Sequence, residues 1–146
     1  MSSAYIPETI RSEVRLRSDG LCEYCLLREL DMGRTFHLDH VIAKKHEGPT
    51  EDHNLSNCCP DCNRRKGSDI ATIVKGEVVR LFNPRIDVWG DHFELDGADI
   101  RPRSIIGEGT IRLLGLNDRF RIAMRRALIA EGRFPSPEAL DRTNAG

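Results

Sequence analysis

Four of the five cysteines of the chain stand in two pairs with the same spacing. Cys22 and Cys25 form the stretch CEYC, and Cys59 and Cys62 form CPDC. A gap of two residues lets both thiolates of a pair bind one tetrahedral Zn²⁺. The sequence therefore predicts a structural zinc site with four thiolate ligands, which leaves no open position for water.

Two other uses of these cysteines are less favoured. Disulfides are not expected, because no export signal is recognised and the cytosol keeps thiols reduced. A redox role for either pair would call for a surrounding βαβ pattern, which the sequence does not show. The fifth cysteine, Cys58, directly precedes the second pair, and we interpret it as a small buried residue rather than a ligand.

The stretch HLDHVIAKK places Asp39 directly before His40, within the segment that separates the two cysteine pairs. A histidine with an ordinary pKa of roughly 6.5 is largely neutral near pH 7 and can take a proton from water. A carboxylate can hold a hard divalent cation. Asp39 and His40 are either a piece of surface or half of an active site.

These residues are expected on a small set of elements. Residues 7–20 suggest a helix, with Pro7 in its first turn and Gly20 at its end. Aromatic and β-branched residues in 34–43 predict a strand, and the turn formers of 44–54 predict a loop. Residues 62–67 suggest a short helix that stops at Gly67.

The last third of the chain has a different pattern. The stretches EVVRLFNPR, HFELDG and DIRPR suggest short strands, with a hairpin turn at Asp96 and Gly97. Asn117 is expected to cap a helix in residues 117–132. Its apolar residues near positions 120, 124 and 128 follow helical spacing, and its arginines are expected on the other face.

The chain has 146 residues, of which 39% are hydrophobic and 31% are charged. This length and composition suggest a single globular domain rather than a multidomain protein. We expect one domain over residues 1–134, with a core at about 20–68, an extension at about 69–134 and a flexible tail at 135–146. A net charge of −1 neither favours nor excludes nucleic acid. No apolar run approaches the ~20 residues that span a bilayer, so a cytoplasmic protein without membrane contact is expected.

The order of CxxC, LDHVIAKKHEGPTEDHNL and CPDCNRRKG resembles the HNH endonuclease family, whose core is a ββα-metal finger. It is most similar to the branch in which four cysteines bind a zinc ion outside the catalytic site. The resemblance implies an α+β fold: a zinc-stabilised, treble-clef-like finger with an N-terminal helix and a C-terminal extension of β-hairpin and helix.

The resemblance also implies roles for individual residues. His40 would be the general base, Asp39 a ligand of the catalytic metal, and Asn54 the asparagine that braces the loop carrying the histidine. Asn63 stands where many members have histidine, which makes the signature H-N-N. An asparagine oxygen suits a hard cation, so Asp39 and Asn63 would hold a divalent metal such as Mg²⁺, Mn²⁺ or Ni²⁺.

A metal-dependent hydrolysis of DNA phosphodiester bonds follows from this resemblance. Adjacent strand residues point in opposite directions, which favours one ligand and one base at Asp39 and His40. Phosphate contacts are expected from five basic side chains of the finger: Lys44, Lys45, Arg64, Arg65 and Lys66. A homodimer would serve a double-strand cut, because one finger cuts one strand.

Two readings of another class remain open. A zinc finger that binds nucleic acid without cutting would use the same scaffold, although it would have no need of Asp39 and His40. A zinc scaffold for protein partners would use the apolar face of the C-terminal helix and would not bind DNA.

Overall fold

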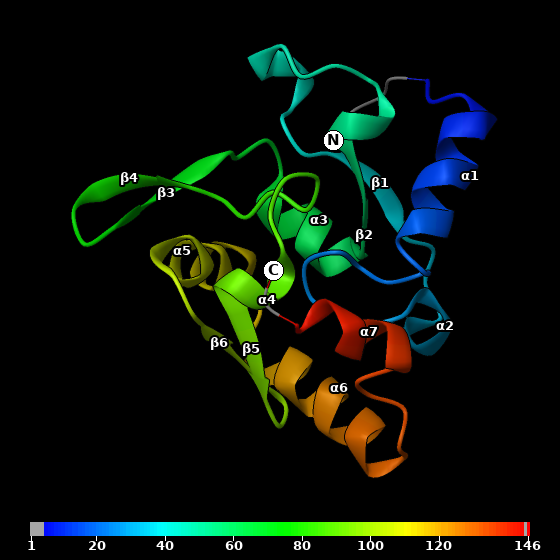
Figure 1. Cartoon of the computed structure of the whole chain (residues 1–146), viewed down its shortest axis with the longest axis vertical. Coiled ribbons are helices and arrows are strands. Elements are labelled where there is room, and N and C mark those ends of the chain that lie inside the picture. The colour runs from blue at the N-terminus through cyan, green and yellow to red at the C-terminus, as the bar shows by residue number, and fades with distance from the viewer. Residues whose placement is uncertain (1–4, 145) are drawn as a thin grey trace. The chain divides into compact units, whose positions relative to one another are not determined.

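The computed structural model describes residues 5–144 and residue 146. The chain divides into two compact units, Met1–Ile70 with Asn83–Ile86 and Ala71–Phe82 with Asp87–Gly146. Helices combine with three separate two-stranded sheets (Figure 1), which confirms the predicted α+β class. Among the described residues, no helix has the length and apolar character needed to cross a membrane.

The first unit begins with helix α1 (Glu8–Arg17), which follows Pro7 as expected. Its buried face carries Val14, which packs with Ile6 and with Leu55 of the finger. At its last residue, the Arg17 guanidinium donates to the carbonyls of Asp52 and Leu55 at 2.5 and 2.6 Å. Helix α1 is thereby fixed beside strand β2 (Leu55–Cys58) (Figure 1).

The finger itself is a strand–loop–strand–helix unit. Strand β1 (His37–His40) pairs antiparallel with β2, with His37 opposite Cys58 and His40 opposite Leu55. Helix α3 (Pro60–Lys66) follows β2 and ends at Gly67, whose φ of +52° lies in the region that favours glycine. The ββα order is as predicted, although β1 is shorter than the expected strand over 34–43.

Smaller elements complete the first unit. The short helix α2 (Glu29–Met32) lies between the first cysteine pair and β1. The long connection from β1 to β2 contains two 3-10 turns, η1 (Lys44–His46) and η2 (Asp52–Asn54). The predicted loop is therefore ordered by local turns and not by a further strand or α-helix.

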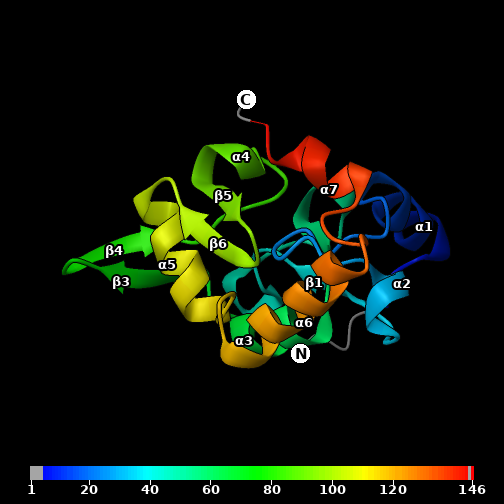
Figure 2. The same cartoon turned by 90° about the horizontal axis from the view of Figure 1, so that it is seen from below.

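The second unit consists of two hairpins and four helices. The hairpins are β3–β4 (Ala71–Val74, Glu77–Arg80) and β5–β6 (Phe93–Asp96, Asp99–Pro102). The helices are α4 (Trp89–His92), α5 (Ile105–Leu114), α6 (Arg119–Ala130) and α7 (Pro137–Arg142). Helix α5 lies against both hairpins (Figure 2). Gly109 permits this approach, since a Cβ there would lie 2.8 Å from Cγ2 of Thr72.

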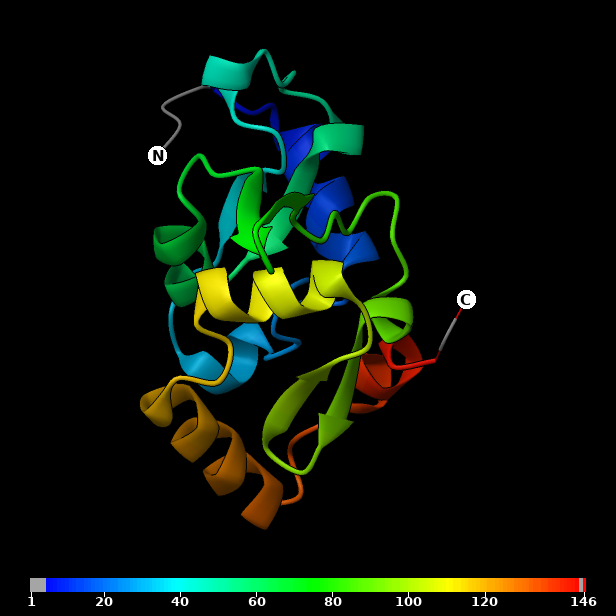
Figure 3. The ribbon, with the colours of Figure 1, turned by 90° about the vertical axis from the view of Figure 1, so that its left-hand side faces the viewer.

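Helix α6 differs from its predicted orientation. Arg121 and Arg125 are buried, whereas Phe120 is 78% exposed. The Arg125 guanidinium donates to the carbonyls of Leu116 and Ala98, both at 2.6 Å, so α6 passes close to the β5–β6 turn (Figure 3). The arginines are inside because the buried carbonyls at the end of α5, at Leu114 and Leu116, lack helical partners and need donors.

One further prediction about this region is wrong. Asn117 does not cap α6, whose N-cap is Asp118; its side chain instead bonds the amide and carbonyl of Ile100 at 2.9 and 2.7 Å. The tail predicted at 135–146 contains α7. The Ser136 hydroxyl caps that helix by accepting from the amide of Ala139, and Ala139 is fully buried.

Candidate functional site

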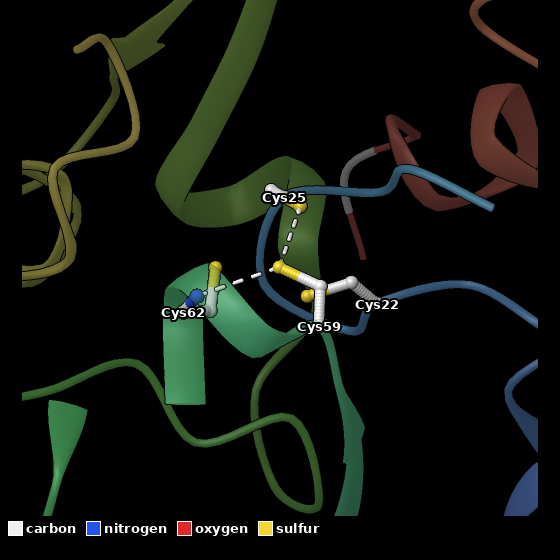
Figure 4. A group of neighbouring side chains, drawn as sticks. All are labelled: Cys22, Cys25, Cys59 and Cys62. Carbon is white, nitrogen blue, oxygen red and sulfur yellow. Dashed lines mark hydrogen bonds between the residues drawn. The ribbon is translucent and has the colours of Figure 1, made fainter. Parts of the chain in front are cut away.

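The four paired cysteines converge on one point in the first unit. The Sγ atoms of Cys22, Cys25, Cys59 and Cys62 all lie within 4.8 Å of one another and are buried (Figure 4). The Sγ atoms of Cys25 and Cys59 are 3.8 Å apart. Tetrahedral Zn–S bonds of ~2.3 Å give sulfur separations of ~3.8 Å, so these residues fit a Zn²⁺ ion.

Burial makes the protonation of these thiols depend on whether a cation is bound. Burial raises the pKa of Cys22 and of Cys62 well above that of an ordinary thiol. A metal ion reverses such shifts, because a coordinated thiol is deprotonated. Cys58 is also buried, and burial raises its pKa to about 11, but it lies outside the four-sulfur cluster, as its interpretation as a packing residue predicts.

The first cysteine pair is attached to the finger through Glu23. Its carboxylate accepts from the amide of Asn57 on β2 at 2.8 Å, and its own amide donates to the Asn57 carbonyl at 2.9 Å. The second carboxylate oxygen forms an ion pair with Arg85, from the segment Asn83–Ile86 of the same unit. Arg85 of the stretch Asn83–Ile86 therefore supplies the counter-ion of a buried carboxylate beside the cysteine cluster.

Asp39 lies on β1 and is 6% exposed. Its Oδ2 atom is 3.0 Å from Nζ of Lys66, which extends from the last turn of α3 and is 1% exposed. This ion pair lacks the alignment of a hydrogen bond, and Oδ2 has no hydrogen-bond partner within the described part of the chain. Burial raises the pKa of Asp39, although the charge of Lys66 acts against that shift.

The ring of His40 has one bonded and one unbonded nitrogen. Its Nε2 lies 2.9 Å from Oγ1 of Thr50, while Nδ1 is buried and has no hydrogen-bond partner among the residues described. Burial first, and then the charges of Lys44 and Lys66, lower the pKa of His40. The imidazole is thus held in place and kept neutral at physiological pH.

Asn54 fastens the loop between His40 and itself. Its Oδ1 accepts from the amide of Ile42 at 3.0 Å, and its Nδ2 donates to the carbonyls of Ile42 and Pro49, both at 2.9 Å. Gly48 allows this closure, since a Cβ at that position would lie 1.7 Å from the Ile42 carbonyl oxygen. The contacts are those of a residue that braces the histidine loop.

The remaining site residues lie on the surface or on α3. Asn63 is half-buried in the middle of α3, and Lys44, Lys45, Arg64 and Arg65 are exposed. Arg64 is paired with Asp61 at 3.4 Å across one helical turn. Lys66 is the exception to the predicted basic surface: it is buried against Asp39 and cannot meet a DNA phosphate from this position, because its ammonium faces the interior.

Three residues were not recognised from the sequence as parts of this site: Arg17, Thr50 and Arg85. Thr50 follows Gly48 and Pro49, and only the turn signal of that stretch could have suggested that the loop folds back on His40. Arg17 and Arg85 each bind groups at least 35 positions away in the sequence. No periodic pattern in the sequence predicts contacts between segments so far apart.

A ββα finger with a four-sulfur cluster and an aspartate–histidine pair on its first strand is the arrangement of HNH-type nucleases. The family model described as HNH endonuclease matches residues 22–69. The resemblance predicted from the sequence is therefore confirmed over this segment, which is similar to HNH endonucleases.

One curated relative is similar over a longer stretch. The Septu protein PtuB of Bacillus thuringiensis is 25% identical over 123 residues, covering 84% of this chain and 47% of that protein. The chain thus spans about half the length of this relative, and the similarity extends beyond residues 22–69. No solved structure matches the chain.

Proposed function

We propose that the chain is a metal-dependent endonuclease that hydrolyses DNA phosphodiester bonds. In this proposal His40 is the general base, Asp39 and Asn63 hold a divalent cation, and Asn54 braces the loop. The placement of His40 carries the proposal, since its ring is fixed by Thr50 and its Nδ1 is buried without a partner in the described chain. The HNH match at residues 22–69 supports the reaction class.

The role of His40 follows from its contacts. In the tautomer that this proposal requires, Nε2 carries the ring proton and donates to the Thr50 hydroxyl, and Nδ1 has a free lone pair. Nδ1 would then take the proton of the attacking water. A lowered pKa keeps this nitrogen unprotonated at neutral pH, where a protonated imidazole could not act as a base.

Asp39 and Asn63 offer oxygen atoms suited to a hard divalent ion such as Mg²⁺ or Mn²⁺. The fit is supported by Asp39 Oδ2, a buried carboxylate oxygen that has no hydrogen bond in residues 5–144 and 146. When bound there, a divalent ion would supply Lewis-acid stabilisation of the phosphate and the leaving oxygen. The cysteine site is separate and, with four thiolates, is structural.

The exposed basic residues near the finger would position the substrate. Arg64 and Arg65 on α3 and Lys44 and Lys45 on η1 have the exposure that phosphate contacts need. Such contacts bind a duplex without reading its sequence. A single finger holds one base and one candidate metal site, so nicking is the expected product of a monomer, and a homodimer would be needed for a double-strand cut.

The proposal is tested by incubating supercoiled plasmid with purified, zinc-loaded protein in Mg²⁺, Mn²⁺, Ni²⁺ or EDTA. The wild type is expected to nick only with added metal, and His40→Ala is expected to be inactive although folded. If both proteins bind DNA and neither cuts with any metal, the chain is a binding module on a nuclease scaffold. Equal cutting by both would point to another base or to a contaminant.

A further inference from the structure

Lys66 has a place in the finger that neither its sequence position nor the proposed reaction explains. Its two basic neighbours on α3, Arg64 and Arg65, are exposed, whereas Lys66 is 1% exposed. Its Nζ donates to the carbonyl of His40 at 3.0 Å and lies 3.0 Å from Oδ2 of Asp39. The ammonium therefore contacts the proposed metal ligand and the backbone of the proposed base at once.

Burial of an ammonium is unfavourable unless a counter-charge and hydrogen bonds replace its water shell. Asp39 provides the charge and the His40 carbonyl provides the hydrogen bond. Lys66 in turn provides the counter-charge that the buried carboxylate of Asp39 needs. Asp39 lies on β1 and Lys66 on α3, and these two elements pack against each other, so the pair is part of the fold of the finger.

We propose that Lys66 is a resident cation of the Asp39 site, which neutralises the carboxylate while no divalent ion is bound and must leave Oδ2 before one can bind. This inference rests on the proposed function, because it takes Asp39 as the metal ligand. It makes Lys66 a residue that sets metal affinity, in place of the phosphate contact expected from the sequence.

Two features of the pair support an exchange over a permanent bond. The ammonium is poorly aligned with Oδ2, which has no hydrogen bond from any described residue. The hydrogen bond to the His40 carbonyl is a second attachment that does not involve Asp39. Nζ can thus shift away from the carboxylate and still retain a partner in the finger.

Electrostatics gives the direction of the effect. A divalent ion on Asp39 would lie a few ångströms from a buried like charge, where repulsion is weakly screened by solvent. Removal of the Lys66 charge is therefore expected to tighten metal binding. If the lysine instead only supported the carboxylate structurally, its removal would weaken binding or leave it unchanged.

The test measures the dissociation constant for Mn²⁺ by the electron paramagnetic resonance signal of free Mn²⁺, without DNA, on the full zinc-loaded chain. Lys66→Met keeps the length of the side chain and removes its charge, and Lys75→Met removes an exposed charge from the β3–β4 turn. We expect Lys66→Met to lower the dissociation constant at least about tenfold and Lys75→Met to leave it unchanged. Equal or weaker binding by Lys66→Met overturns the proposal.

Asp39→Asn distinguishes a failure of the proposed metal site from a failure of the proposed role of Lys66. If this variant binds Mn²⁺ as the wild type does, Asp39 is not the ligand and the proposed active site fails. If it does not bind, and Lys66→Met binds no more tightly than the wild type, only the role of Lys66 fails.

A measurement on the wild type covers the case in which Lys66→Met does not fold. The side-chain nitrogen resonances of ¹⁵N-labelled lysines are followed by NMR during titration with Mg²⁺. We expect the Lys66 resonance to shift in step with Mg²⁺ binding, and Asp39→Asn to abolish that shift. A Lys66 resonance that stays fixed while Mg²⁺ saturates the site contradicts the exchange.

Discussion

The Nε2 atom of His40 lies 2.9 Å from the hydroxyl oxygen of Thr50, ten positions further along the chain. Thr50 reaches this place because the loop folds back at Gly48 and is held by the three hydrogen bonds of Asn54. The loop between β1 and β2 is thus the part of the finger that holds the ring of His40, the proposed base. The middle asparagine of the signature acts on His40 through this loop.

We expect Thr50→Val to reduce the cleavage rate while the protein stays folded. The change keeps the shape of the side chain and removes the hydrogen bond that fixes the imidazole. Loss of one partly buried hydrogen bond of ~1–3 kcal/mol corresponds to a fall of about ten- to a hundredfold in kcat. Initial nicking rates over a range of plasmid concentrations should show kcat reduced and KM unchanged.

Thr50→Ser is the matched control, because it restores the hydroxyl without the methyl group. It should recover most of the rate that Thr50→Val loses. Full activity of the valine variant, or no recovery with serine, would show that the hydroxyl does not orient His40.

Short-range patterns in the sequence predicted the finger well. The CxxC spacing predicted that the four cysteines cluster, as they do in the structure, since two thiols three positions apart at a turn approach one point by local geometry alone. The turn residues after His40 and the helix stop at Gly67 are likewise local signals. Structural features that depend on neighbours within a few positions were therefore predictable from the sequence.

Contacts between distant segments account for the errors. In the sequence Lys66 cannot be distinguished from its exposed neighbours Arg64 and Arg65. Only the packing of α3 on β1 makes it the partner of Asp39, 27 positions earlier in the chain. Arg125 was assigned to solvent because charge usually marks the exposed face of a helix. In the structure Arg125 is buried because it donates to the carbonyls of Leu116 and Ala98. No pattern within α6 predicts these contacts.

The four-cysteine cluster makes a prediction about stability. We expect one zinc ion per chain, and its removal by a chelator should unfold the finger, because such sites supply about 10–16 kcal/mol to folding. Cys59→Ser should lose the metal and shift thermal unfolding to lower temperature. Metal content by atomic absorption and circular dichroism melting curves measure both effects.

Cys58 provides a close control for this experiment, since it is buried and adjacent to Cys59 but outside the four-sulfur cluster. Cys58→Ser should retain zinc. Loss of zinc from this variant would place Cys58 among the ligands and contradict the assignment.

The ion pair of Arg85 and Glu23 predicts a role for the stretch Asn83–Ile86 in stability. The side chains are 11% and 3% exposed, so Arg85→Met leaves a buried carboxylate without its counter-charge. Breaking such a pair costs about 3–5 kcal/mol, which urea unfolding should detect as a lower midpoint. Adding Glu23→Gln to Arg85→Met should recover part of the loss, because the amide oxygen can still accept from the Asn57 amide.

An exposed pair serves for comparison. Arg101 and Asp96 on β5–β6 are 55% and 58% exposed, so Arg101→Met should change stability by less than about 1 kcal/mol. A similar cost for Arg85→Met and Arg101→Met would mean that the Glu23 pair contributes no more than a surface contact.

Arg64 and Arg65 are the best candidates for phosphate contacts, because they are exposed on the helix that also carries Asn63. Replacing both by alanine should weaken binding to all DNA sequences alike. Each lost phosphate contact should reduce the slope of log K against log salt by about 1. Fluorescence anisotropy with a labelled duplex, at several salt concentrations and with EDTA to prevent cleavage, gives both quantities.

Arg101→Ala on β6, combined with Arg103→Ala directly after that strand, removes the same charge and is the matched control for this measurement. It should leave the salt slope unchanged if the finger makes the contacts. Equal losses for the two double variants would mean that net charge, and not the position of α3, governs binding. If the Arg64→Ala, Arg65→Ala protein has the same salt slope as the wild type, other residues contact the DNA phosphates. Lys44 and Lys45 are then the next residues to replace.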